Sequence, residues 1–276
     1  MNIVDVPLNR SNHQNITPRG GGIAIFASII IIYTAFIFLY SKNLYDLLPI
    51  ICLVPILIIS FIDDIKNINF IARVAVQLIS VSAGIYIIYF SPENSLLSLF
   101  SHLLDTDSQL LVGDNYVLPR LFPNFIPLYL ELLLIGIGWI WFINLYNFMD
   151  GIDGITVTQT ITIAIGIIAM TLIASYDSKY IYLSLAIIGA ILGFAIYNWH
   201  PAKIFMGDIG SVSLGYLLGF LLIELSLNGS YLAIILFLSY YLSDSGITIT
   251  KRLIAGKKIW QAHSEHFYQQ AARNRQ

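Results

Sequence analysis

Oxygen-bearing side chains gather in one short stretch, N-L-Y-N-F-M-D-G-I-D-G, which lies between two long apolar runs. It contains four amides and carboxylates: Asn144, Asn147, Asp150 and Asp153. Such groups are costly next to hydrocarbon, so their presence there indicates a functional site. Their oxygens are the ligands that a hard cation such as magnesium prefers. The plainer alternative is a polar turn between two membrane helices.

Two further motifs place carboxylates at the ends of apolar runs. Asp63 and Asp64 are adjacent, and because like charges repel, a nearby cation is favoured. They can position a metal or act as a base, or they are solvated acids at a helix end. Lys66, three residues after Asp63, can bind an anion. The alternative is that this lysine only marks the cytoplasmic side of the membrane, where basic residues are common.

The stretch N-W-H-P-A-K-I-F-M-G-D-I-G-S, residues 198–211, holds Asp208 between two glycines at the start of an apolar run. The N-terminal end of a helix favours anions, so this acid suits a metal that carries phosphates. A helix N-cap is the plainer interpretation. Lys203 in the same stretch adds positive charge for a phosphate.

The two ends of the chain are basic and polar. Arg10, His13 and Arg19 precede the run Gly20–Gly22, and guanidinium groups with exposed glycine N–H groups predict an anion cradle. In the tail, His263 and His266 share one helix face. One carboxylate nearby gives a zinc site little support, and contact with phosphate or sugar hydroxyls fits equally well.

The elements that must position these motifs are membrane helices. The chain has 276 residues, of which 57% are hydrophobic and 11% charged, with a mean hydropathy of +0.78. Soluble domains have about 25% charged residues. Apolar runs of helix length predict an all-α integral membrane protein, a polytopic bundle of about eight spans in one domain, 1–276. The expected spans are 23–40, 47–62, 70–90, 126–146, 155–175, 180–197, 212–227 and 231–249.

Charge orients this bundle. Eleven of the fourteen Lys and Arg residues fall on the face that carries the N-terminal loop, the motif loops and the tail. The positive-inside rule predicts that this face is cytoplasmic. All the polar motifs therefore lie on one side, which predicts a single composite site. Asp244, at the inner end of its span, is expected to support that site. Residues 91–125 lie on the other side, with a small hairpin expected at 113–115.

Taken together, the motifs resemble the polyprenyl-phosphate N-acetylhexosamine-1-phosphate transferases, glycosyltransferase family 4, which include phospho-MurNAc-pentapeptide transferase. The matching pieces are P-L-N-R-S-N-H, T-P-R-G-G-G, D-D-I-K, N-F-M-D-G-I-D-G, N-W-H-P-A-K-I-F-M-G-D-I-G-S and H-S-E-H-F-Y-Q. They cover nearly the whole chain in the family's order. The P-R-G-G-G and H-x-x-H forms look most like the O-antigen and lipopolysaccharide initiating type. The family usually has about ten or eleven spans.

The resemblance implies a reaction in which a UDP-N-acetylhexosamine and undecaprenyl phosphate give undecaprenyl-diphosphate-sugar and UMP. It implies Mg²⁺ as the cofactor, with Mn²⁺ as a substitute, and a place in the bacterial inner membrane with a cytoplasmic site. The expected partners are the two substrates and the lipid bilayer, with no nucleic acid, and a homodimer stays open. The sugar is open among GlcNAc, FucNAc, QuiNAc and GalNAc.

The resemblance also implies roles for individual residues. The implied metal ligands are Asp208 and Asn147, and the implied catalytic pair is Asp63 and Asp64. Nucleotide binding is expected from Asp150, Asp153, Asn198 and Phe205. Phosphate and sugar binding are expected from Arg19, Lys66, Lys203, His263 and His266.

Three alternatives stay open at this point. The lipid phosphate attacks directly, which we favour, or an acyl-phosphate forms on Asp63 or Asp64. An ion-coupled transporter would need charged residues deep in its spans and inverted repeats, neither of which is prominent in the sequence. A membrane lipid-phosphate hydrolase would use the same metal chemistry with water.

Overall fold

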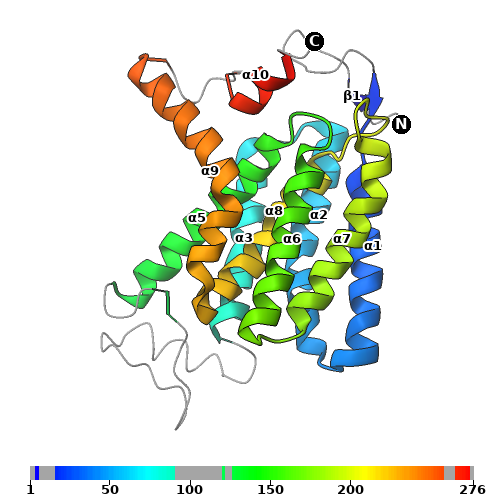
Figure 1. The fold of residues 1–276 in the computed structure, drawn as a ribbon, viewed down its shortest axis with the longest axis vertical. Coiled ribbons are helices and arrows are strands. Elements are labelled where there is room, and N and C mark those ends of the chain that lie inside the picture. The colour runs from blue at the N-terminus through cyan, green and yellow to red at the C-terminus, as the bar shows by residue number, and fades with distance from the viewer. Residues whose placement is uncertain (1–3, 6–15, 91–119, 122–125, 258–264, 274–276) are drawn as a thin grey trace.

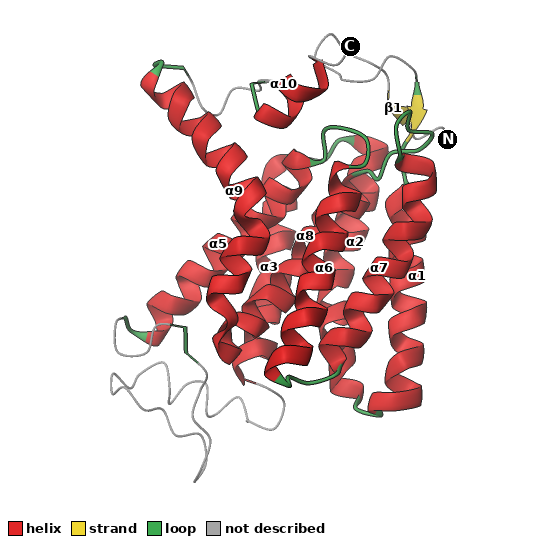
Figure 2. Cartoon of the chain, in the orientation of Figure 1, coloured by secondary structure: helices red, strands yellow, loops and turns green. Residues whose placement is uncertain are grey.

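A computed structural model describes residues 4–5, 16–90, 120–121, 126–257 and 265–273. Most of the described residues are helical (Figures 1 and 2). The helices are α1 (Gly21–Phe36), α2 (Leu48–Lys66), α3 (Phe70–Phe90), α5 (Leu128–Met149), α6 (Ile155–Ala174), α7 (Lys179–Asn198), α8 (Asp208–Leu225), α9 (Tyr231–Ile254) and α10 (Phe267–Arg273). Short turns of helix, η1 (Ile37–Ser41), η2 (Leu44–Leu47) and η3 (Ser226–Ser230), join some of them, and β1 (Val4–Asp5) pairs antiparallel with β2 (Thr17–Pro18).

Seven helical segments of the described chain are long and apolar enough to cross a membrane. One of them, containing α8, is the central helix, with 83% of its most apolar window buried against 28–44% in the other six. The outer helices turn large apolar side chains outward, among them Ile71, Ile173 and Ile196. A water-soluble bundle would bury such a surface, whereas lipid accommodates it. The protein is therefore a multi-pass membrane protein, as the composition predicts.

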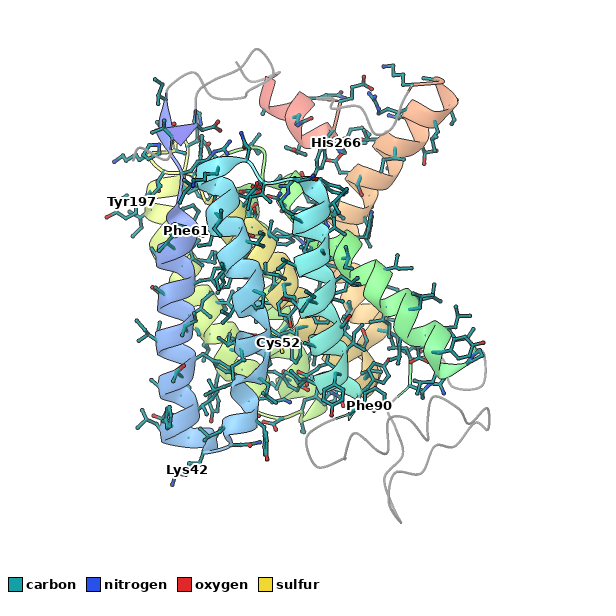
Figure 3. All side chains as sticks on the ribbon, turned by 180° about the vertical axis from the view of Figure 1, so that it is seen from behind. Lys42, Cys52, Phe61, Phe90, Tyr197 and His266 are labelled. Atoms are coloured by element: carbon teal, nitrogen blue, oxygen red, sulfur yellow. The ribbon has the colours of Figure 1, made fainter. Side chains whose placement is uncertain are left out.

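All the described polar motifs lie at one end of the bundle. The helices alternate in direction, so that α2, α5, α7 and α9 end where α1, α3, α6 and α8 begin (Figure 1). Seen from behind, Phe61, Tyr197 and His266 mark this end, and Lys42 and Phe90 mark the other (Figure 3). We call it the motif end. The predicted gathering of the motifs on one side is confirmed for the described residues, while the direction in which that side faces stays a prediction.

Two boundaries differ from the sequence expectation in an informative way. The second and seventh spans were expected at 47–62 and 212–227, but α2 continues through Asp63 and Asp64, and α8 already begins at Asp208. The acids are therefore held on helix ends, not in open loops. The expected eighth span forms α9, which leans away from the bundle (Figure 1) and is not among the seven apolar segments. Its second half carries Asp244, Lys251 and Arg252, which lower its hydropathy.

The glycine run at the start of α1 serves packing. The N–H groups of Gly21 and Gly22 donate to the carbonyls of Phe205 and Met206, at 3.0 and 2.9 Å. A Cβ at Gly22 would collide with the backbone of Gly210 in α8. The anion cradle expected from these two glycines is therefore wrong, because their N–H groups are already used to dock α1 against the segment that leads into α8.

This contact predicts that Gly22→Ala destabilises the protein. The added methyl group has no room between α1 and α8, and overpacking of this kind costs about 1–3 kcal/mol. The variant should unfold at a lower temperature than wild type in detergent, as monitored by circular dichroism. Gly193→Ala is the matched control, because a Cβ there meets nothing within 4 Å. Equal unfolding temperatures for the two variants would contradict the close approach of α1 and α8.

Candidate active site

The acids at the end of α2 hold the start of α8. The two carboxylate oxygens of Asp64 accept the backbone N–H groups of Asp208 and Ile209, at 2.9 and 3.0 Å. These N–H groups belong to the first turn of α8, where no helical carbonyl is available to them, and the helix dipole also favours a carboxylate there. Gly207, with φ +75°, brings the chain so close that a Cβ would lie 2.6 Å from Asp64 Oδ2. Asp64 thus fixes the position of Asp208.

A cation stands between the other two acids. Arg73, in the first turn of α3, lies with its Nη1 2.8 Å from Asp63 Oδ2 and 3.2 Å from Asp208 Oδ2. Asp63 also accepts the N–H of Ile68, just after α2. From the sequence alone, Arg73 is expected only to contribute to the charge bias of this face. The available signal was its position, one turn inside an otherwise apolar span.

Asn147 reaches the same place from α5. Its side-chain oxygen accepts the hydroxyl of Ser211, at 2.6 Å, and Ser211 lies one turn into α8 from Asp208. One turn earlier, Asn144 donates to Gln77 of α3, at 2.8 Å. These polar contacts inside an apolar bundle tie α3, α5 and α8 together at the motif end. Asp63, Asp64, Asn147 and Asp208 are therefore brought together, as the sequence predicts.

The loop after α5 is tied to the loop after α7. Buried Asn198 accepts the N–H of Gly154 and donates to the carbonyl of Ile204, both at 3.0 Å. Asp153 Oδ2 lies 2.8 Å from His200 Nδ1 and accepts the N–H of Ala202, at 3.0 Å. The expected nucleotide residues Asn198 and Asp153 thus also build the wall of the site.

Asp150 follows α5 directly and accepts a hydrogen bond from Thr156 of α6. Burial raises the pKa of Asp150 to about 6, against the opposing effect of that hydrogen bond. A carboxylate with this pKa is largely ionised at neutral pH. Asp150 can therefore accept hydrogen bonds from a ligand while remaining close to the point where it gains a proton.

The expected phosphate-binding residues lie around the same end. Arg19 forms an ion pair with Asp5, at 2.9 Å, and its backbone forms a parallel bridge with Phe205. Lys66 and Lys203 are exposed, one at the end of α2 and one before α8. Arg19 and Phe205 are thus neighbours through the backbone. The two lysine side chains lie exposed at the surface of the motif end. Arg10, His13, His263 and the hairpin expected at 113–115 lie outside the described residues.

His266 is buried just before α10, with its Nδ1 3.2 Å from Asp244 Oδ1 of α9. Its ring meets the ring of Phe148 edge-on, with centroids 4.7 Å apart. Burial lowers the pKa of His266, and the nearby Asp244 carboxylate offsets this only in part. This direction of the pKa shift favours the neutral imidazole.

The donors at this end fit a magnesium ion only with help from a substrate. In the part of the chain that the structure describes, no group of three or more His, Cys, Asp or Glu side chains is arranged to hold a metal. Magnesium is commonly held by one or two carboxylates, with water and substrate phosphates completing its shell. Asp63 and Asp208 already converge on one positive group, the Arg73 guanidinium. Asp208, with the Asn147 amide nearby, supplies a suitable minimal donor set.

The clamp formed by Asn198 predicts a loss of stability on Asn198→Ala. The change leaves the buried N–H of Gly154 and the partly buried carbonyl of Ile204 without their partner, at about 1–3 kcal/mol for a fully buried unsatisfied group. Thermal unfolding should show a clear decrease, with little change for Asn228→Ala, an exposed amide at the opposite end. If Asn198→Ala instead kept wild-type stability and only bound the nucleotide more weakly, Asn198 would be a direct ligand without a structural role.

The fold and this site define a helical membrane protein whose acids, amides and bases converge from separate helices at one end of the bundle. Residues 46–226 match the sequence profile of glycosyl transferase family 4. The chain belongs to this family and is a transferase, which confirms the family prediction.

Individual relatives agree with this assignment. A probable undecaprenyl-phosphate N-acetylglucosaminyl 1-phosphate transferase of Bacillus subtilis (strain 168) is 27% identical, over 96% of this chain and 68% of that protein. The phospho-N-acetylmuramoyl-pentapeptide-transferase of Streptococcus pneumoniae (strain CGSP14) is 27% identical over 91% and 73% of the two chains. The Kosmotoga olearia protein of that name is 30% identical over 93% and 76%. None of these relatives is a transporter or a hydrolase.

Proposed function

We propose that this chain transfers an N-acetylhexosamine 1-phosphate from a UDP-sugar to undecaprenyl phosphate, giving undecaprenyl-diphosphate-sugar and UMP. The observation that carries the proposal is the convergence of Asp63, Asp208 and Arg73 at the start of α8 in a chain of this family. Relatives named for undecaprenyl-phosphate sugar-1-phosphate transfer support the substrate class. The proposed reaction is the first membrane step of cell-envelope polysaccharide synthesis.

The proposed location is the bacterial inner membrane, with the motif end facing the cytoplasm. The bacterial relatives support the first part and the charge bias supports the second. A polyprenyl tail in the bilayer presents its phosphate at the membrane surface, which is where the ends of α2 and α5 and the start of α8 would lie. Both substrates are anions, so the site must first neutralise charge.

Mg²⁺ would be held by Asp208 and Asn147, and when bound it would neutralise the diphosphate and the leaving UMP. Arg73 would turn from the acids to an incoming phosphate. Its Nε is buried and, among the described residues, has no hydrogen-bond partner, so a phosphate oxygen would satisfy it. Arg19, Lys66 and Lys203 would add positive charge at the rim, and Asp150 and Asp153 would accept hydrogen bonds from the nucleotide.

Asp63 would orient the lipid phosphate and remove its remaining proton when one is present. A phosphate monoester loses its second proton near pH ~6, so a strong base is not needed. A lipid phosphate oxygen then attacks the sugar-bearing phosphorus, and the bond from that phosphorus to the UMP oxygen breaks. Asp64 is engaged with two backbone N–H groups, which favours a positioning role and the direct route over an acyl-phosphate on Asp64.

The test is UMP release by the purified protein against a panel of UDP-sugars, with the lipid product identified by mass spectrometry. One UDP-N-acetylhexosamine should support release, and only when undecaprenyl phosphate is added. UMP release without the lipid phosphate would favour a hydrolase and contradict the proposal. A radiolabelled covalent enzyme intermediate would contradict the direct route but leave the overall reaction standing.

A further inference from the structure

A buried carboxylate outside the acid cluster, which we define as Asp63, Asp64 and Asp208, holds the start of α10 in place. Asp244 lies on α9, and its side chain is 2% exposed. Its oxygens face the imidazole Nδ1 of His266, at 3.2 Å, and accept the backbone N–H groups of Phe267 and Tyr268, at 2.9 and 3.2 Å. Thr248, one turn along α9, donates to the same carboxylate, at 3.3 Å. A carboxylate buried this deeply is retained only where its partners satisfy it.

These partners belong to the segment that contacts the last turn of α5. The hydroxyl of Tyr268 donates to the carbonyl of Phe148, at 3.2 Å, and the ring of His266 packs against the ring of Phe148. Phe148 is the residue between Asn147, at the acid cluster, and Met149, the last residue of α5. Asp244 therefore connects α9 to the acid cluster through the start of α10.

The same contact selects the tautomer of the neutral histidine ring. In a neutral imidazole, the group that faces one nitrogen decides which nitrogen carries the proton. A carboxylate beside Nδ1 favours the tautomer with the proton on Nδ1, and Nε2 then carries the lone pair. Loss of the carboxylate removes this preference and also the acceptor for two backbone N–H groups.

We propose that Asp244 is a positioning residue that holds His266 in its Nδ1–H tautomer and fixes it, with the start of α10, against Phe148. Its relevance to catalysis rests on the proposed transfer reaction. Outer groups that orient a metal-binding histidine through its second ring nitrogen typically affect metal affinity or activity by about 10- to 100-fold, and we expect an effect of the same order here. Asp244 does not touch the reacting phosphates in this proposal and acts only through His266 and α10.

A double-mutant cycle tests the connection in activity. Asp244→Asn and Asp244→Ala should lower kcat for UMP release, by about 10- to 100-fold for the alanine variant, and less for asparagine, which keeps one oxygen acceptor. In a His266→Ala background, the same changes should have a much smaller effect, because residues that act through one another are not additive. Glu224→Gln is the matched control, since it removes a partly buried, ion-paired carboxylate at the opposite end of the bundle. Equal effects of Asp244→Ala in both backgrounds would overturn the proposal.

Nitrogen NMR of labelled histidine gives a readout that needs no activity. The spectrum of wild type at neutral pH should show His266 with its proton on Nδ1, the signal being assigned by loss in His266→Gln. Both Asp244 variants should reduce the share of this tautomer, the alanine variant more strongly, and asparagine serves if the alanine variant does not fold. An unchanged His266 signal in the folded variants would overturn the positioning role. Because the NMR readout does not depend on turnover, failure of the positioning proposal can be distinguished from failure of the proposed transfer reaction.

Discussion

Asp208→Asn should abolish the transfer of sugar phosphate while leaving the fold intact. The substitution keeps the size of the side chain but removes the charge that we assign to the divalent ion. A bound metal ion contributes several kcal/mol to the stabilisation of developing charge, so kcat should fall by about 10³-fold or more. The backbone N–H of residue 208 still donates to Asp64, so the start of α8 should keep its position.

The measurement is steady-state UMP release, with thermal unfolding as the check on folding. Glu224→Gln provides the control for loss of a partly buried carboxylate, because Glu224 and its partner Lys179 lie at the opposite end of the bundle. Activity within tenfold of wild type in a folded Asp208→Asn protein would remove Asp208 from the centre of the mechanism.

Arg73→Ala should produce the second largest loss. Without the guanidinium, Asp63 and Asp208 would face each other without a cation, and the incoming phosphate would lose a charged donor. Removal of one preorganised donor to developing charge typically costs about 10²- to 10³-fold in kcat. Arg73→Lys should recover part of this loss, since it restores the charge but not the fork of the guanidinium.

Arg120→Ala is the matched control for Arg73, because Arg120 also pairs with a buried acid, Glu131, at the opposite end. It should affect unfolding more than turnover. If Arg73→Ala instead turned over at the wild-type rate, the partly buried bridge between Asp63 and Asp208 would be a structural feature without a role in phosphate binding.

The membrane fold follows from the sequence because the spans are long, apolar and separated by polar motifs. The segment 70–90 forms α3 with the expected bounds. The motif acids were harder to place, since hydropathy ends a span where the first carboxylates appear. In the structure, α8 begins at Asp208 because the Asp64 carboxylate, at the end of α2, accepts the N–H groups of its first turn, a long-range contact that no local pattern carries.

The candidate site shows the same contrast between features that the local sequence predicts and features that depend on long-range packing. The gathering of Asp63, Asp64, Asn147 and Asp208 at one end follows from alternating spans alone. The bridging by Arg73 does not, because it depends on how α3 is rotated against α2 and α8. The glycines at 21 and 22 illustrate the opposite error: exposed N–H groups were expected from composition, whereas the docking of α1 onto residues 205–206 uses them.

The most direct measurement is the binding of UDP, which every UDP-sugar donor contains, by isothermal titration calorimetry with Mg²⁺ and with EDTA. The account predicts that wild type binds UDP much more tightly when Mg²⁺ is present, and that Asp208→Asn binds it equally weakly in both conditions. Equal affinity of wild type with and without Mg²⁺, or a full magnesium effect in Asp208→Asn, would contradict a divalent ion held at the start of α8.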